Sequence, residues 1–176
     1  MKYKLTNYFN QTTARLILRA CHEEDIPKYE SFFVLNPSLP YLGIDLTLDK
    51  TANAKIWIEN QLSRYEKIGL GHLAITDKST SEFMGTAGII PRLIDDKPYM
   101  EIAYSLKQEF WGKGFASEAT QQLLKFGLAQ ELSKSYVSII HVENFASKKV
   151  AINNGMKVFF NIQYLGMPVE VFEISI

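Results

Sequence analysis

The sequence predicts one domain spanning residues 1–176, an α/β (α+β) fold in which a mixed, mostly antiparallel sheet of about seven strands is flanked by about four helices. One observation behind this prediction is a group of apolar, strand-like segments between residues 71 and 106, joined by short polar turns. Another is a helix-like segment between two later strand-like segments, which is typical of parallel strands joined by a helical crossover. A chain of 176 residues suits a single core.

The first part of the chain is predicted to hold one strand and two helical segments. Residues 14–20 (ARLILRA) alternate leucines with arginines, as a half-buried strand does. Residues 23–36 have helical composition, whereas residues 36–43 contain two prolines and a glycine and are expected to be irregular. A second helix is expected from residue 49 to about residue 67, because apolar side chains recur there at helical spacing and a glycine follows.

The middle of the chain changes to strand-like patterns. Residues 71–76, 83–93 and 99–106 are predicted strands. The turns between them, residues 77–82 and 95–98, are rich in Asp, Ser, Thr and Pro. Three strands joined by such short turns predict an antiparallel meander.

The last part of the chain alternates helices and strands. A helix is expected after the glycine at position 114, with its small and apolar side chains along one side. Residues 135–142 are a predicted strand, and residues 144–155 a short helix that begins at an asparagine and ends at a glycine. Two final strands are expected at residues 157–164 and 169–176.

Composition excludes several classes of protein. Lys plus Arg and Asp plus Glu both number 19, so the chain lacks the basic excess of a general nucleic-acid binder. No apolar run approaches the roughly 20 residues of a membrane span, and the first residues lack the apolar region of a signal peptide. A single cysteine, Cys21, permits no internal disulfide and is read as a core residue. We therefore expect a cytoplasmic protein with no membrane or direct nucleic-acid partner.

Metal binding is not predicted. The three histidines, His22, His72 and His141, are not grouped with other ligand types, and a zinc site needs three or four placed ligands. His141 closely precedes Asn144, so it either lines the acceptor side of a site or is an ordinary core or edge histidine.

The stretch Gly112-Lys113-Gly114, just before a predicted helix, is the first candidate for chemistry. Helix N-termini offer free N–H groups, and glycines let them approach a phosphate. A turn that needs glycine only for its backbone angles is the alternative. A Walker loop would require glycine at Lys107, and a dinucleotide-binding loop would require a third glycine at Ser117, so neither fits.

Four stretches in order resemble a known family over nearly the full length from residue 12. They are TTARLILRACHEEDI, HLAITDKSTSEFMGTAGI, MEIAYSLKQEFWGKGFASEA and VENFASKKVAINNGM. Together they resemble the GNAT superfamily of acetyl-CoA-dependent N-acetyltransferases, and its ribosomal-protein (RimJ/RimL-like) branch most closely. The resemblance implies a GNAT fold, and acetyl-CoA as co-substrate without a metal.

The resemblance also implies the residues that bind the cofactor. The family loop, Q/R-x-x-G-x-G/A, maps onto residues 109–114, with Glu109 out of pattern. Its amides hold the pyrophosphate, and the preceding strand pairs with the pantetheine arm. Trp111 is interpreted as a packing anchor for the loop. The implied cofactor-binding residues are Ala103, Tyr104, Ser105, Leu106, Phe110, Trp111, Gly112, Lys113, Gly114, Phe115, Ala116, Asn144 and Ser147.

Two catalytic residues follow from the same resemblance. Glu101 matches the carboxylate that takes the proton from the substrate ammonium, often through water, and a raised pKa would suit that role. A surface Glu or one paired with a lysine is the alternative. Ser147 matches the residue near the leaving thiolate, since the family's tyrosine position is Ala151 here; a plain helix-start serine is its alternative. Backbone N–H groups are expected to hold the oxyanion.

The acceptor is expected to be a primary amine, with the N-terminus of a ribosomal or other protein first and a polyamine, amino acid or aminoglycoside as the small-molecule alternative. Residues 36–48 and 164–167 are expected to line its site, with Asp45 and Asp49 as candidate ammonium partners. A catalytically silent acyl-CoA-binding module and a nicotinamide-dependent oxidoreductase are the competing functions. The protein is expected to be a monomer or homodimer.

Overall fold

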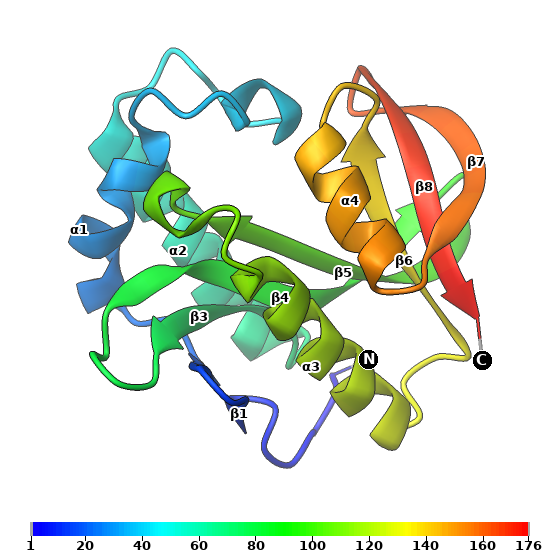
Figure 1. Ribbon diagram of the computed structural model, residues 1–176, viewed down its shortest axis with the longest axis horizontal. Coiled ribbons are helices and arrows are strands. Elements are labelled where there is room, and N and C mark those ends of the chain that lie inside the picture. The colour runs from blue at the N-terminus through cyan, green and yellow to red at the C-terminus, as the bar shows by residue number, and fades with distance from the viewer. Residues whose placement is uncertain (1, 176) are drawn as a thin grey trace.

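The computed structural model describes residues 2–175 and contains one eight-stranded sheet with helices on both faces (Figure 1). The strand order is β1-β2-β3-β4-β5-β6-β8-β7. The strands are β1 (Asn10–Thr12), β2 (Leu16–Arg19), β3 (Gly71–Asp77), β4 (Phe83–Ile94), β5 (Lys97–Leu106), β6 (Ser135–His141), β7 (Lys157–Tyr164) and β8 (Met167–Ser175). The α-helices are α1 (Ile26–Tyr29), α2 (Lys50–Lys67), α3 (Phe115–Ala129) and α4 (Phe145–Asn153). The predicted fold class is confirmed.

The N-terminal elements lie close to their predicted positions. The strand predicted at residues 14–20 is β2, and α1 is one short turn flanked by 3-10 turns. The second predicted helix is α2, whose first turn is capped by the Asp49 side chain accepting from the Ala52 N–H (2.8 Å). The sequence did not indicate β1, because its three residues are polar and carry no alternation; they form a strand by pairing with β2.

The predicted meander is confirmed as β3, β4 and β5, which pair antiparallel in sequence order. The turn between β4 and β5 is tight: Asp95 and Asp96 both have positive φ, as a two-residue hairpin turn of this kind needs. The turn fixes the register, in which Ile90 lies opposite Glu101 and Arg92 opposite Tyr99. Glu101 and Arg92 are therefore diagonal neighbours on one face of the sheet.

The predicted crossover is also confirmed, since α3 connects β5 to β6 and these two strands run parallel. Their pairing is limited to one residue pair, Glu101 with Val137. Just beyond that pair, the Ser138 hydroxyl donates to the Ile102 carbonyl (2.8 Å). From residue 103 onward, β5 has a strand partner on its β4 side only. A gap thus opens in the middle of the sheet.

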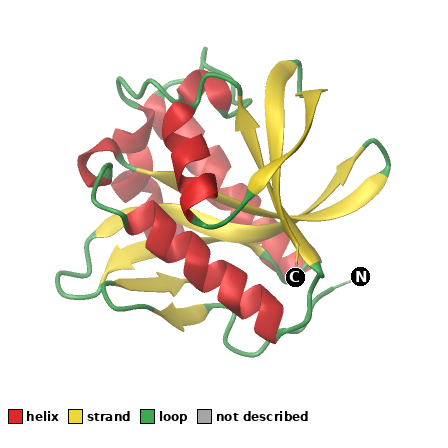
Figure 2. Ribbon diagram, turned by 45° about the vertical axis from the view of Figure 1, so that its right-hand side comes forward, coloured by secondary structure: helices red, strands yellow, loops and turns green. Residues whose placement is uncertain are grey.

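The two faces of the sheet are covered by different helices, with α3 and α4 on one face and α1 and α2 on the other (Figures 1 and 2). A large buried cluster joins β5 side chains such as Ile102 to Leu123 of α3. A second cluster packs Ala74 of β3 against Ile58 of α2. The final predicted strand at residues 169–176 is β8, and Ile176 lies outside the described residues. Within residues 2–175, no helix is long and apolar enough to span a bilayer.

Candidate functional site

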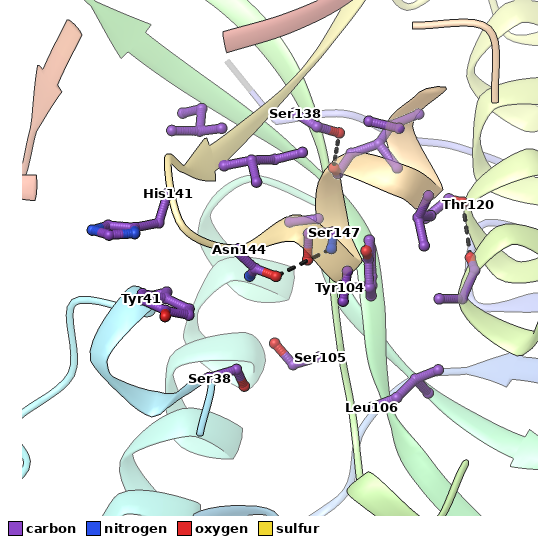
Figure 3. A pocket seen from close by; sticks show the side chains of 18 of the residues that line it. Ser38, Tyr41, Tyr104, Ser105, Leu106, Thr120, Ser138, His141, Asn144 and Ser147 are labelled. Atoms are coloured by element: carbon purple, nitrogen blue, oxygen red, sulfur yellow. Dashed lines mark hydrogen bonds between the residues drawn. The ribbon is translucent and has the colours of Figure 1, made fainter. Parts of the chain in front are cut away.

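A cavity of about 670 Å³ lies at the gap between β5 and β6. It is lined by residues from both faces of the sheet, including Gly112 at the start of α3 and Trp57 of α2. Figure 3 shows side chains from β5, α3, α4 and the segment around Tyr41 converging on this space. The cavity therefore connects the two faces through the sheet.

The open edge of β5 forms one wall of the cavity. Residues 103–106 line it, and no β6 residue pairs with them. An unpaired strand edge presents N–H and C=O groups to any extended ligand that enters the gap. Side chains alternate along this wall, so that Tyr104 packs with the α3 cluster while Ser105 lies on the side of α1, where its carbonyl accepts from the Tyr29 hydroxyl (3.2 Å).

The glycine loop forms the end of the cavity on the α3 face. Gly112 and Gly114 both have positive φ, of 72° and 80°, and Gly114 is the N-cap of α3. The first helical amide with a backbone acceptor is that of Glu118, which donates to the Gly114 carbonyl (3.0 Å). The amides before it are left free, as at any helix N-terminus. The Trp111 indole N–H donates to the Leu106 carbonyl (2.7 Å) and ties the loop to the end of β5.

Arg15, just before β2, holds the glycine loop from outside. Its Nη1 donates to the Lys113 carbonyl (3.0 Å), and its Nε pairs with a Glu118 carboxylate oxygen (2.6 Å). Its guanidinium also lies over the Phe115 ring, 4.3 Å from the centroid. Glu118 accepts in addition from the Thr13 hydroxyl and the Arg15 N–H. These contacts fix the loop and the first turn of α3 to each other.

Glu101 lies on the opposite face, buried to 6% exposure, and lines the same cavity. One carboxylate oxygen accepts from Arg92 Nε at 2.6 Å. Burial opposes the charge of Arg92, but the neighbouring Glu101 carboxylate outweighs it and raises the pKa of the guanidinium. The partner of Glu101 is therefore an arginine of the adjacent strand, and neither the surface position nor the lysine pairing that the sequence left open is observed.

The N-terminus of α4 supplies polar groups to the gap on the face that α4 shares with α3. The Asn144 Oδ1 accepts from the Ser147 N–H (3.1 Å) and caps the helix (Figure 3). Tyr104 of β5 lies beside Ser147; burial raises the pKa of the Tyr104 phenol to about 12, and a hydrogen bond with the Ser147 side chain opposes that rise. Ser147 thus contacts a neutral phenol in the gap.

The outer part of the cavity is covered by two irregular segments. Tyr41 stacks on His141 at 4.4 Å between ring centroids, and both line the cavity. Leu165 and Met167 of the β7–β8 turn also line it. Of the two predicted acceptor segments, residues 36–48 contribute Tyr41 among others, and residues 164–167 contribute their apolar side chains.

The aspartates predicted as ammonium partners have other contacts. Asp45 accepts from the N–H and hydroxyl of Thr47 (2.9 and 2.6 Å), and Asp49 caps α2. Neither lines the cavity. Both carboxylates stabilise local backbone, so the prediction that they face the acceptor is not supported by their positions.

A buried polar cluster lies in the cavity wall on the face covered by α2. The Thr86 hydroxyl lies within hydrogen-bond distance of both the Trp57 indole nitrogen (3.2 Å) and His72 Nδ1 (3.1 Å). Burial lowers the pKa of His72 to about 3, and the charges of Arg64 and Arg92 act in the same direction. His72 is therefore neutral at physiological pH and part of the cavity wall.

The cavity brings nearly all predicted site residues together. Every predicted cofactor-binding or catalytic residue lines it except Lys113, whose ammonium lies near the Phe110 ring at 5.8 Å from the centroid. The sequence did not point to Trp57 or Arg92. The register of the β4–β5 hairpin could have identified Arg92 as the diagonal neighbour of Glu101, whereas nothing local marks Trp57.

Cys21 and the possible metal ligands can be examined in the described part of the chain. Cys21 is buried, and burial raises the pKa of its thiol to about 12, so it is a core residue and not a nucleophile. Across the described chain, residues 2–175, no group of three His, Cys, Asp or Glu side chains is placed to hold a metal ion.

Known proteins are similar to this chain in sequence or in fold. The family model described as "Acetyltransferase (GNAT) domain" matches residues 15–157. The Bacillus licheniformis protein "Uncharacterized N-acetyltransferase p20" is 31% identical over 140 residues, which are 78% of this chain and 76% of that protein. The structure of RimL, "Ribosomal L7/L12 alpha-N-protein acetyltransferase in complex with Coenzyme A", has a TM-score of 0.75 at 19% identity and covers 94% of this chain and 97% of that one.

A further structural neighbour is "Microcin C7 self immunity acetyltransferase MccE in complex with Acetyl-CoA and AMP", with a TM-score of 0.78 at 16% identity, covering 93% of this chain and 94% of that one. These solved structures share the fold, and the two neighbours contain coenzyme A or acetyl-CoA. Because the family model covers most of the chain and a relative above 30% identity carries the name N-acetyltransferase, the chain belongs to the GNAT acetyltransferase family and is an acyltransferase.

Proposed function

We propose that this protein transfers the acetyl group of acetyl-CoA to a primary amine at the gap between β5 and β6. The observation that carries the proposal is a single cavity with Gly112 and Gly114 at one end and the buried Glu101 carboxylate at the other. A helix N-terminus with free amides suits a pyrophosphate, and a buried carboxylate suits an ammonium that must lose a proton.

The cofactor would lie along three parts of the site. The amides between Gly112 and Ser117 would hold the pyrophosphate, and the unpaired edge at residues 103–106 would pair with the pantetheine arm as an added strand. Asn144 and Ser147 face the same gap from α4. The side-chain amide nitrogen of Asn144 is available, since its oxygen caps the helix.

The transfer would use groups on both sides of the gap. Glu101, directly or through water, takes a proton from the ammonium, and the amine nitrogen then forms a bond to the thioester carbonyl carbon. The carbon–sulfur bond breaks and the nitrogen gives up its remaining extra proton. The leaving thiolate receives a hydrogen bond from Ser147, or it is protonated through the Ser147 hydroxyl, which takes up one proton as it donates another. Tyr104 stands behind Ser147 and can supply the hydrogen-bond chain. No covalent intermediate on the protein is required.

The amine acceptor belongs to one of two classes. The likeness of the sequence to the ribosomal-protein branch makes the N-terminal amine of a ribosomal or other protein the first class, and a small-molecule amine is the second. RimL acts on a protein N-terminus, and MccE confers immunity to microcin C7, according to their names. Both share the fold with this chain at under 20% identity.

The alternative to catalysis is a module that binds acyl-CoA without turnover. Incubating the protein with acetyl-CoA and a panel of amines, with thiol release and product mass as readouts, separates the two. The proposal expects thiol release that depends on the amine and a mass increase of one acetyl group on that amine. Tight acetyl-CoA binding with no thiol release from any amine would contradict it.

A further inference from the structure

The acceptor end of the cavity carries an excess of positive charge in its buried part. Glu101 pairs with Arg92, and Arg64 of α2 is close enough that burial and the charge of Arg92 lower the pKa of its guanidinium, while Glu101 opposes that change. His72 is neutral there, since burial and the two arginines lower its pKa to about 3. Two guanidinium groups therefore lie near one carboxylate, with Arg92 in the cavity lining and Arg64 outside it.

The other charged residues that line the cavity do not compensate this excess. Glu143 and Lys149 are both exposed to water near α4, carry opposite charges and cancel each other. Water and salt screen such exposed groups far more than buried ones. An anion that entered the buried part would relieve the repulsion between the two arginines.

The Arg92–Glu101 pair leaves hydrogen-bonding groups free on both partners. Only Nε of Arg92 and one oxygen of Glu101 are joined, at 2.6 Å. Within residues 2–175, no further hydrogen bond is found for the two Nη groups of Arg92 or for the second oxygen of Glu101. The Arg92 side chain is 29% exposed and lines the cavity. A planar guanidinium with two free Nη groups is well suited to a carboxylate.

The remaining walls of the acceptor end are apolar and aromatic. Phe32, Trp57 and Leu42 line it from the side of α1 and α2, and Leu165 and Met167 cover it from the β7–β8 turn. Within residues 2–175, the acidic side chains that line the cavity are Glu101, which is paired with Arg92, and the exposed Glu143, whereas Asp45 and Asp49 lie off the cavity. The walls therefore suit an apolar substituent and disfavour a polyamine or aminoglycoside.

We infer that the acceptor is a small amine with a carboxylate next to the amino group, an α-amino acid with an apolar side chain. Its ammonium group faces the free oxygen of Glu101, and its carboxylate takes the free Nη groups of Arg92. In an α-amino acid the ammonium and the carboxylate are attached to the same carbon and lie close together. Glu101 and Arg92, their proposed partners, are likewise in direct contact. This inference rests on the proposed acetyl transfer and, of its two classes of acceptor, selects the small-molecule amine.

The test compares acceptors that differ only in the carboxylate. The twenty amino acids are first screened for acetyl-CoA-dependent thiol release, and the best apolar one is compared with its amide and with its decarboxylated amine. The inference expects a kcat/KM for the acid at least about tenfold above both analogues, a discrimination typical of one lost charge-assisted contact. The analogues keep the amine and side chain, so equal or higher rates for them would overturn the inference.

The second arm removes the arginine. In Arg92→Gln the ratio of kcat/KM for the acid to that for the amide should fall toward one, and Arg92→Lys should keep part of it. The ratio is the readout, because Arg92 contacts Glu101 and absolute rates will fall for all acceptors. Arg15→Gln on the cofactor side is the matched control and should keep the ratio. A ratio unchanged in both Arg92 variants would contradict the inference.

The outcomes also separate this inference from the proposed function. Thiol release with spermidine or with an N-terminal peptide as the best acceptor would support acetyl transfer and overturn the carboxylate-bearing acceptor. Absence of thiol release with every amine would overturn both.

Discussion

His72 shows how a single side chain in the cavity wall sets a pH limit on stability. It is buried within hydrogen-bond distance of the Thr86 hydroxyl, and burial lowers its pKa to about 3, from 6.5. The unfolded chain therefore binds a proton between these pH values that the folded chain does not. Stability contributed by neutral His72 is complete above pH 6.5 and is lost progressively as the pH falls below it.

We predict that the unfolding free energy falls more steeply with pH below 6.5 in the wild-type protein than in His72→Gln. The difference between the two slopes should reach up to about 1.4 kcal/mol per pH unit. Urea unfolding at several pH values between 7 and 4.5 measures this difference. The exposed His22 provides the control, since His22→Gln should keep the wild-type pH slope. Equal slopes for wild type and His72→Gln would show that His72 is not neutral in the folded state.

The sequence could indicate the position of Glu101 in the site but not its ion-pair partner. The sequence placed it in the site through its resemblance to a family motif, but its ion pair with Arg92 depends on how β4 and β5 pair. The Arg92 Nε lies 2.6 Å from a Glu101 carboxylate oxygen, a contact that no local sequence pattern indicates. The partner of the Glu101 carboxylate could therefore be named only once the pairing of β4 with β5 was known.

Among the structural elements, the glycine loop needs glycine at residue 112 for its backbone angles and not because of crowding. A Cβ at Gly112 would meet no atom within 4 Å, yet φ is +72°, which disfavours any side chain. Gly166 in the β7–β8 turn has the same character, with φ of +75° and free space around it. The two glycines form a matched pair, one at the proposed pyrophosphate site and one outside it.

We predict that Gly112→Val weakens coenzyme A binding about tenfold or more, because the altered backbone and the new side chain remove amides from the pyrophosphate. Gly166→Val should lower thermal stability about as much as Gly112→Val does, because both glycines have positive φ, and should leave the coenzyme A affinity within about twofold of wild type. Calorimetric titration with coenzyme A and thermal melting measure the two quantities. If both variants bind coenzyme A like the wild type, the Gly112 loop is only a turn.

Arg15 gives a second prediction at this scale. It joins the Lys113 carbonyl to Glu118, so it should hold the loop in the shape that binds the cofactor. Because the Arg15 side chain is about half exposed, we expect Arg15→Met to weaken the binding free energy of acetyl-CoA by about 0.5 to 1 kcal/mol. This corresponds to a rise of about two- to fivefold in KM for acetyl-CoA, with little change in kcat. Steady-state kinetics with Arg15→Met, Glu118→Gln and the double variant tests it; additive effects would contradict a shared contact.

At the scale of the whole molecule, the site exists because two parallel strands share only one residue pair. Patterns along the chain predicted the strands, the helices and the crossover, since each depends on local periodicity and caps. The gap between β5 and β6 and the closure by Tyr41 on His141 depend on contacts between distant segments. Family resemblance supplied the cofactor residues, while Arg92, Trp57 and the charge of the acceptor end required the folded chain.

If Glu101 deprotonates the amine that is acetylated at this gap, turnover depends on its carboxylate while coenzyme A binding does not. Turnover by Glu101→Gln is measured as thiol release with the best amine acceptor from the screen, together with coenzyme A affinity by calorimetry. Glu109→Gln is the matched control, because Glu109 pairs with Lys107 outside the cavity.

We predict that Glu101→Gln lowers kcat by about 10² to 10⁴, the usual contribution of a positioned base, while its coenzyme A affinity stays within about twofold of wild type. Glu109→Gln should keep both quantities. A Glu101→Gln protein that folds, binds coenzyme A and turns over at the wild-type rate across pH would show that Glu101 is not the base.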